Sequence, residues 1–203
     1  MKVSGRLFSL LASYDESDVT MQQFFAAWSE KVSIEEVTRI LHADLETSTP
    51  AHFDNWGPGS DGTGDEESGV LIGQVGTWTL TVGDRCCTSD DSLSALSQSK
   101  GRALSIEWDP DNRDPTIKYA IDGKVITSMN IIDTADRSGV NPDALDAYME
   151  GLRFDVDSDD AVEPNESFTS ALIMIGRITG HELDSSWLDA THVCYTIHAS
   201  EDE

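Results

Sequence analysis

Acidic side chains recur at short intervals in the last third of the chain, and their spacing is its clearest indication of chemistry. Asp155, Asp157, Asp159 and Glu166 occupy positions 1, 3, 5 and 12 of a twelve-residue stretch. Carboxylates at these positions are oxygen ligands of calcium in helix–loop–helix sites. At position 6, where calcium loops place glycine for a sharp turn, this chain has aspartate. Two interpretations stay open: a divalent-cation site with calcium as its cofactor, and a solvated acidic linker.

Cysteine and histidine side chains offer a second set of metal ligands. His192, Cys194 and His198 alternate along a predicted strand and would share one of its faces. Cys86 and Cys87 are adjacent to each other and distant from that strand in sequence. No pair has the CxxC or HxxxH spacing typical of zinc sites. We therefore expect packed side chains here, and an odd number of cysteines favours a reducing cytoplasm.

Motifs for nucleotide binding and for nucleophilic catalysis are incomplete. The stretch 57–62 matches a GxGxxG fingerprint, but no predicted strand precedes it and carboxylates follow it. Ser60 lacks the glycine that a nucleophile elbow requires two residues earlier. Paired acids such as Glu35 and Glu36 are too common in this chain to single out an acid and a base. The sequence names no catalytic residue, and whether the protein is an enzyme stays open.

The net charge is the dominant feature of the composition. The chain has 38 Asp and Glu against 13 Lys and Arg, a formal net charge of −25 in 203 residues. A surface of this sign repels nucleic-acid phosphates and anionic lipids, and it attracts basic proteins and cations. We therefore expect no nucleic-acid and no membrane partner, and a basic protein as the partner. Abundant Asp and scarce Lys also fit a salt-adapted protein whose charge serves solubility.

Length and hydropathy favour one domain. Residues 1–203, of which 38% are hydrophobic, can build one sizeable core. We expect a single globular domain with acidic loops near 49–69 and 155–166 and a frayed C-terminal tail. The first residues lack a signal-peptide cleavage pattern, and no stretch of about 18 apolar residues occurs. These features predict a cytoplasmic protein.

Capping signals predict the helices. Ser33 and Glu36 form a capping box, and the apolar face of the helix that they begin extends to Leu45. A short helix is predicted over 93–98. Asn141 is a good N-cap, so a further helix is predicted from there into Leu152.

The last predicted helix covers 167–179. It is apolar on most sides and ends at Gly180, which suits a left-handed C-cap. We expect it to be the central helix, packed on a sheet.

Period-two alternation predicts the strands. Asp122-Gly123 between two alternating runs predicts a hairpin, because both central residues of a type I′ turn need positive φ. The segment 24–28 is ambiguous, since its apolar spacing suits both a helix and a strand. The predicted strands are 70–75, 78–82, 104–108, 117–121, 124–129 and 193–197. The resulting fold class is α+β, with an antiparallel sheet of about five to six strands packed against two or three helices.

Three segments carry a family resemblance. They are RSGVNPDAL at 137–145, Gly151-Leu152, and Ala171-Leu172 through the RITG run at 177–180. Together they resemble an uncharacterised domain of unknown function found mainly in actinobacteria, and the similarity extends over about residues 20–197. The resemblance implies a small intracellular α+β domain and carries no known active site.

Three functions are consistent with these observations. The leading hypothesis is a non-enzymatic acidic interaction module that binds a basic protein, as an immunity or inhibitor protein does. The first alternative is a domain that binds a divalent cation or a small ligand. The second is a salt-adapted protein with an enzymatic activity that its sequence does not reveal.

Overall fold

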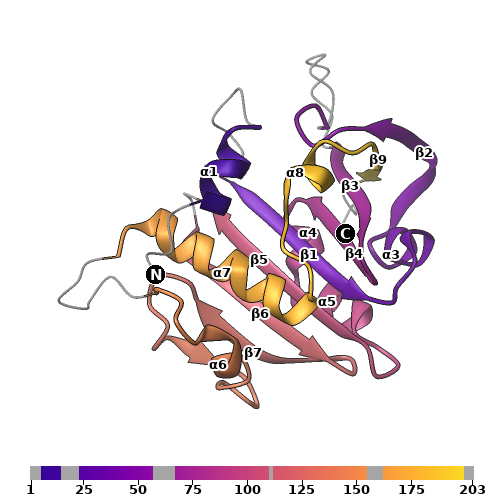
Figure 1. Cartoon of the computed structure of the whole chain (residues 1–203). Coiled ribbons are helices and arrows are strands. Elements are labelled where there is room, and N and C mark those ends of the chain that lie inside the picture. The colour runs from indigo at the N-terminus through magenta and orange to yellow at the C-terminus, as the bar shows by residue number, and fades with distance from the viewer. Residues whose placement is uncertain (1–5, 15–22, 57–66, 110–111, 155–161, 199–203) are drawn as a thin grey trace.

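The computed structural model describes residues 6–14, 23–56, 67–109, 112–154 and 162–198. In this part of the chain nine strands form one sheet, in the order β2-β9-β3-β4-β1-β5-β6-β7-β8 (Figure 1). Every neighbouring pair is antiparallel. The strands are β1 (Phe24–Glu30), β2 (Ala43–Ala51), β3 (Glu67–Val75), β4 (Trp78–Gly83), β5 (Arg102–Asp109), β6 (Asn112–Ile121), β7 (Lys124–Asn130), β8 (Arg137–Ser138) and β9 (His192–His198).

The prediction of five to six strands and two or three helices is wrong, because the described residues form nine strands and seven helices. The sequence left the segment of β1 ambiguous between helix and strand, and it did not predict β2 and β8. In β1 six of the seven residues are buried, so both of its faces are covered and no alternation is visible. The edge strand β2 is largely polar and contains Pro50, and β8 has only two residues. Alternation identifies half-buried strands, and these three are not of that kind.

Helices cover both faces of the sheet. In Figure 1 α7 crosses the sheet diagonally on the face nearer the viewer. On that face α1 packs against α7, and on the other face α3, α4 and α5 pack together and on the strands. The helices are α1 (Arg6–Ala12), α3 (Ile34–Ile40), α4 (Arg85–Thr88), α5 (Asp90–Leu96), α6 (Asp146–Met149), α7 (Pro164–Thr179) and α8 (Ser185–Leu188).

The sheet separates two apolar cores. Under α7 the core contains large side chains, including Trp28, Leu104 and Ile106 from the strands and Leu172 and Ile175 from the helix. On the other face the strands contribute alanines beneath the short helices, together with larger residues such as Phe25 and Ile72. Small side chains let short helices lie close to the sheet, and the larger ones give α7 a broad apolar contact. None of the described helices is long and apolar enough to cross a membrane.

Several local predictions are confirmed. Ser33 Oγ accepts a hydrogen bond from the N–H of Glu36 and caps α3. Asp122 and Gly123 have φ values of 49° and 78°, and they join β6 to β7 as the type I′ signal predicts. Gly180 ends α7 with a φ of 79°.

Two helices are shorter than predicted. The helix after Ser33 ends at Ile40, so Leu45 lies in β2 and not on a helix face. The helix predicted from Asn141 is reduced to α6, because the N–H of Asn141 bonds the carbonyl of Ile126 in β7. That bond fixes the chain to the edge of the sheet and delays the helix by several residues.

Candidate interaction surface

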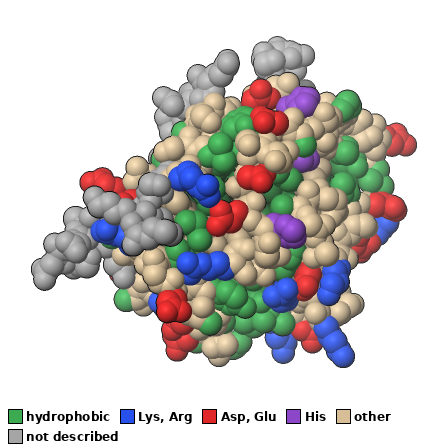
Figure 2. Space-filling model, viewed as in Figure 1, with side chains coloured by type: hydrophobic (Ala, Val, Ile, Leu, Met, Phe, Trp, Pro, Cys, Tyr) green, Lys and Arg blue, Asp and Glu red, His purple; other side chains and the backbone are tan. Residues whose placement is uncertain are grey.

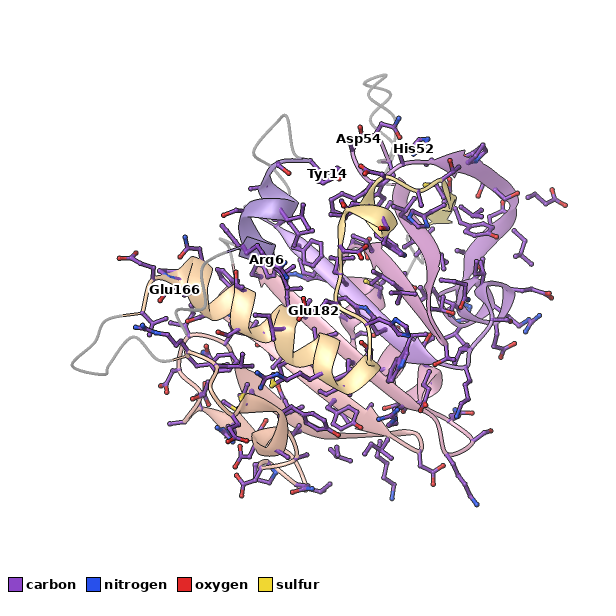
Figure 3. All side chains as sticks on the ribbon, in the orientation of Figure 1. Arg6, Tyr14, His52, Asp54, Glu166 and Glu182 are labelled. Atoms are coloured by element: carbon purple, nitrogen blue, oxygen red, sulfur yellow. The ribbon has the colours of Figure 1, made fainter. Side chains whose placement is uncertain are left out.

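The predicted calcium ligands are only partly within the structure. Asp155, Asp157 and Asp159 lie outside the described residues. Glu166 lies in the first turn of α7, at the outer end of that helix in Figure 3, and its Oε2 is 3.6 Å from Nε of Arg153. Among the described residues no group of three or more His, Cys, Asp or Glu side chains is placed to hold a metal ion. Of the four predicted ligands, the one that is placed faces a guanidinium.

The cysteines and histidines of the second predicted set lie on opposite faces of the sheet. Cys87 is buried in the core beneath α4 and α5, and Cys86 packs against the same core. Cys194 packs against the core under α7, where His192 stacks on a tryptophan of α8 with ring centroids 4.0 Å apart. The side chain of His198 lies outside the described ones. The sheet therefore prevents these thiols and His192 from forming one site.

The three thiols are held in their protonated form. Burial raises the pKa of Cys87 and of Cys194. Burial also raises the pKa of Cys86, and a hydrogen bond with Asp84 adds to that effect. Since the thiolate is the form that attacks electrophiles and binds metals, these surroundings suppress both kinds of chemistry.

A polar group lies where α1 meets the segments around α8. Figure 3 shows Tyr14, His52 and Asp54 near one another at this end of the molecule. The hydroxyl of Tyr14 donates to Oδ1 of Asp189 at 2.6 Å, and that bond raises the pKa of the phenol. Nε2 of His52 lies 3.4 Å from the hydroxyl of Thr191. The phenol stays a donor to a carboxylate, so its observed role is to attach α1 to the chain before β9.

An exposed acidic surface lies at the β8 edge of the sheet. The segment 133–150 carries five carboxylates and one arginine, a formal net charge of −4. All five carboxylate residues are exposed. We call this surface the acidic ridge, and its acids are Asp133, Asp136, Asp143, Asp146 and Glu150.

Val140 is an exposed apolar residue within the acidic ridge. Its exposed fraction is 82%, the higher of the two values among the exposed large hydrophobic residues in the described part of the chain. The other is Leu45 at 48%, in β2 at the opposite edge of the sheet. An exposed aliphatic side chain within a segment of exposed carboxylates has the two components of an interface with an apolar centre and a charged rim.

The backbone beneath Val140 is fixed by its neighbours. Gly139 has a φ of 114°, and a Cβ there would overlap the carbonyl oxygen of Ile126. Only glycine fits this conformation and this close approach to β7. The N–H of Asn141 donates to the same carbonyl at 2.9 Å, and the hydroxyl of Thr127 donates to the carbonyl of Pro142 at 3.1 Å.

Two arginines hold the acidic ridge from inside. Arg137 is largely buried and forms ion pairs with Asp146 and, at 3.7 Å, with Asp143. Arg177 of α7 donates from Nη1 to the carbonyl oxygens of Tyr148 at 2.7 Å and of Glu150 at 2.8 Å. These carbonyls end α6, so α7 caps it from outside. The segments 137–145 and 177–180, which are distant in sequence, therefore both support this one surface.

A model of a family of unknown function, DUF6461, matches residues 19–201. The chain belongs to this family. The match includes the whole sheet, the acidic ridge and α7, whereas α1 precedes it. No curated protein and no solved structure matches the chain. The family is one of unknown function, so the function has to be argued from the structure.

Sequence reasoning did not identify the acidic ridge, because it assigned most of the segment to a helix with a buried stripe. A signal was nevertheless present. Gly139 directly before Val140, among acids spaced three to seven residues apart, is an unusual setting for a branched apolar residue. Glycine two residues before the predicted N-cap also argues for a turn.

Proposed function

We propose that this protein is a non-enzymatic interaction module that binds a basic protein partner through the acidic ridge, as an immunity or inhibitor protein does. The observation that carries the proposal is Val140, which is 82% exposed in a segment whose five carboxylates are all exposed. Apolar side chains supply much of the free energy at the centre of an interface. Charged side chains around them set the orientation and the choice of partner.

The fixed backbone supports the proposal. Binding loses free energy when a loop must become ordered, by about 0.5–1.5 kcal/mol for each immobilised flexible side chain. Val140 has few rotamers, and the Gly139 and Asn141 contacts to Ile126 already define its backbone. The conformational entropy that the acidic ridge loses on binding a partner should therefore be small.

The charge distribution supports a basic partner. The acidic ridge has a net charge of −4, and the whole chain has −25, so both the local and the long-range field attract cations. Long-range attraction increases the association rate and weakens as salt screens it, with a Debye length of about 8 Å at 0.15 M. Contacts at Val140 depend little on salt, because they are apolar. A specific complex should therefore persist at moderate salt, and charge-only association should not.

The first experiment is affinity capture from a lysate of the source organism, at low salt and at about 0.15 M salt, with mass spectrometry of the retained proteins. Wild type is compared with Val140→Ser and with Leu45→Ser, which removes the exposed aliphatic side chain of the opposite edge. We expect one basic protein to be retained at moderate salt. Its affinity should fall at least tenfold in Val140→Ser, equivalent to about 1.4 kcal/mol, and stay unchanged in Leu45→Ser.

A charge-matched pair of double variants tests the acidic rim. Asp136→Asn with Glu150→Gln removes two charges from the acidic ridge, and Asp91→Asn with Glu46→Gln removes two exposed charges elsewhere. The ridge variant should slow association several-fold more than the control, since close charges steer more strongly than distant ones. If only salt-labile mixtures are captured, or if the paired variants behave alike, the acidic ridge is not a specific binding surface.

A further inference from the structure

A cleft of about 770 Å³ lies between α3 and α5, at the end of the sheet where β1 ends and β5 begins. Ligand pockets in proteins commonly have volumes of about 300–1,000 Å³. The lining of the cleft comes from three segments that are distant in sequence. They are the β1–α3 turn with the first turn of α3, the last residue of α3, and residues 95–101 at the end of α5.

The cleft concentrates lysine in a chain that has few. Lys31 and Lys100 both line it, although the whole protein has only five lysines. Figure 2 shows Lys and Arg side chains, with Asp and Glu side chains among them, along the lower right of the molecule, where Figure 1 places the loops at this end of the sheet. An anion in the cleft would meet two ammonium groups, although the overall field of the molecule repels it.

The carboxylates of the lining are already paired. Glu30 receives two hydrogen bonds from Arg102, at 2.8 and 3.0 Å, and Glu36 pairs with Arg39 on α3. Lys31 lies 3.4 Å from Glu30, but it shares that carboxylate with the closer guanidinium. Among the described side chains Lys100 forms no ion pair. Arg39 also pairs with Glu35, and Asp122 lies beside Lys100, so the charges around the cleft balance and the two lysines are the cationic groups of its lining.

The backbone conformation places both lysines. Lys31, Ser99 and Lys100 have φ values of 60°, 57° and 64°. They are three of the five non-glycine residues that have a positive φ in the described part of the chain. Such conformations are costly for residues with a Cβ and tend to occur at functional sites. Hydrogen bonds retain them here. The N–H of Lys31 donates to the carbonyl of Thr77 at 2.9 Å, and that of Lys100 donates to Oδ1 of Asp122 at 2.9 Å.

Apolar side chains form the rest of the cleft wall. Val32 and Ile40 line it from the α3 side, and Ala95 and Leu96 line it from α5. A ligand that reaches these residues must have an apolar part, because burying polar groups against them would leave hydrogen bonds unmade. The two lysines of the same lining favour a ligand that also carries an acidic group.

We propose that this cleft binds a small organic anion, with its acidic group at Lys31 and Lys100 and its apolar body against Ile40 and Leu96. The site lies at the end of the sheet near α3 and α5, whereas the acidic ridge lies along the β8 edge. It does not depend on the partner binding proposed for the ridge, so either proposal can fail alone.

The test uses 8-anilinonaphthalene-1-sulfonate, a fluorescent organic anion with an apolar body, on the full chain at about 0.15 M salt, where distant carboxylates are screened. Saturable binding at one site is expected. Lys31→Gln and Lys100→Gln should each weaken it at least fivefold. Glutamine, like lysine, has a Cβ and no branch at it, so the backbone strain at these positions does not change.

Lys124→Gln is the matched control. It removes the same charge from the start of β7, beside the Asp122–Gly123 turn, but Lys124 does not line the cleft. Its affinity for the dye should stay within twofold of the wild type. Equal weakening in all three variants, or dye binding without saturation, would overturn the proposal.

Octanoate provides the second measurement. It should displace the dye, and it should move the backbone amide resonances of Lys31, Ser99 and Lys100 in nitrogen-15 spectra. Inorganic phosphate at the same concentration should displace much less dye, because it has no apolar body. Resonance shifts confined to other parts of the chain would show that the cleft is not the binding site.

Discussion

The guanidinium of Arg102 holds the carboxylate of Glu30 at two points, with Nε to Oε2 at 2.8 Å and Nη2 to Oε1 at 3.0 Å. The pair connects the end of β1 to the start of β5. The same guanidinium lies over the ring of Trp78, 5.0 Å from its centroid. The side chain of Glu30 is 15% exposed and that of Arg102 is 31% exposed, so water screens the pair only in part.

The first prediction concerns this pair and pH. The hydrogen bond from Arg102 outweighs burial and lowers the pKa of Glu30. A carboxyl group whose pKa is lower in the folded state than in the unfolded state stabilises the fold at pH values above the unfolded-state pKa. This stabilisation is lost as the pH falls through the folded-state pKa. Glu30→Gln should therefore cost about 1–3 kcal/mol at pH 7 and progressively less below about pH 4, measured by urea unfolding.

Glu35→Gln is the control for this prediction. Glu35 pairs with Arg39 at 2.9 Å on the surface of α3, and both side chains are more than half exposed. Its loss should cost no more than about 0.5 kcal/mol at any pH. Equal costs for the two variants would show that the two-point geometry of the Glu30 pair adds nothing.

The second prediction separates backbone strain from steric overlap at the acidic ridge. Gly139 and Gly151 both have positive φ, at 114° and 72°, but only a Cβ at Gly139 meets other atoms. Gly151→Ala should cost about 1–2 kcal/mol, because alanine is strained in the left-handed region. Gly139→Ala should cost more, since it must also push β7 away from the loop. Thermal unfolding of both variants measures the difference, and equal costs would contradict the close approach to Ile126.

Much of the sheet could be predicted from local patterns, and the missing parts have a common physical cause. The β6–β7 hairpin followed from Asp122-Gly123, because few residues other than glycine, asparagine and aspartate tolerate that turn. β1 was ambiguous, because helices cover both faces of the sheet at Phe24–Glu30 and leave no polar face to mark the period. β2 is an edge strand with a bulge and Pro50, features that keep an edge from pairing with other chains but also conceal it in the sequence.

The candidate surfaces depend on tertiary contacts that no local pattern contains. Val140 is exposed because Gly139 and Asn141 bind the edge of β7, about fifteen residues earlier in the chain. The α3–α5 cleft brings Lys31 and Lys100 together at the paired ends of β1 and β5, although the two residues are distant in sequence. The calcium-loop pattern, by contrast, was fully local, and three of its four residues lie outside the described part of the chain. The calcium-site prediction used local spacing alone, whereas the two candidate surfaces are formed by residues that only the tertiary fold brings together.

The third prediction concerns the cysteines. Burial raises the pKa of all three thiols, so the thiolate fraction of each at pH 8 is below that of a free cysteine. Labelling by 5,5′-dithiobis(2-nitrobenzoate) should therefore be much slower in the native protein than in urea, where three thiols should react at once. A native thiol that reacts as fast as the unfolded chain would contradict the protonated state. Cys86→Ser would then identify whether the partly exposed member of the adjacent pair is responsible.

The fourth prediction concerns Gly73 in β3 and His192 in β9. The imidazole lies directly over Gly73, so a Cβ at that position would overlap Nδ1, while Nε2 lies 2.7 Å from the carbonyl of Trp187. Gly73→Ala should cost about 1–3 kcal/mol through overpacking. His192→Ala should cost a similar amount, because it removes the stacking on Trp187 and a buried hydrogen bond.

The double variant distinguishes steric overlap from a general weakness of these strands. With the imidazole gone, the added methyl group enters the vacated space, so Gly73→Ala should cost little in the His192→Ala background. The double-mutant cycle should then show a favourable coupling of about 1–2 kcal/mol, measured by urea unfolding. Leu80, the cross-strand neighbour of Gly73, is unchanged in all four proteins and keeps the β3–β4 pairing constant. Additive costs would mean that the ring can move aside, and that glycine at position 73 serves the strand and not the histidine.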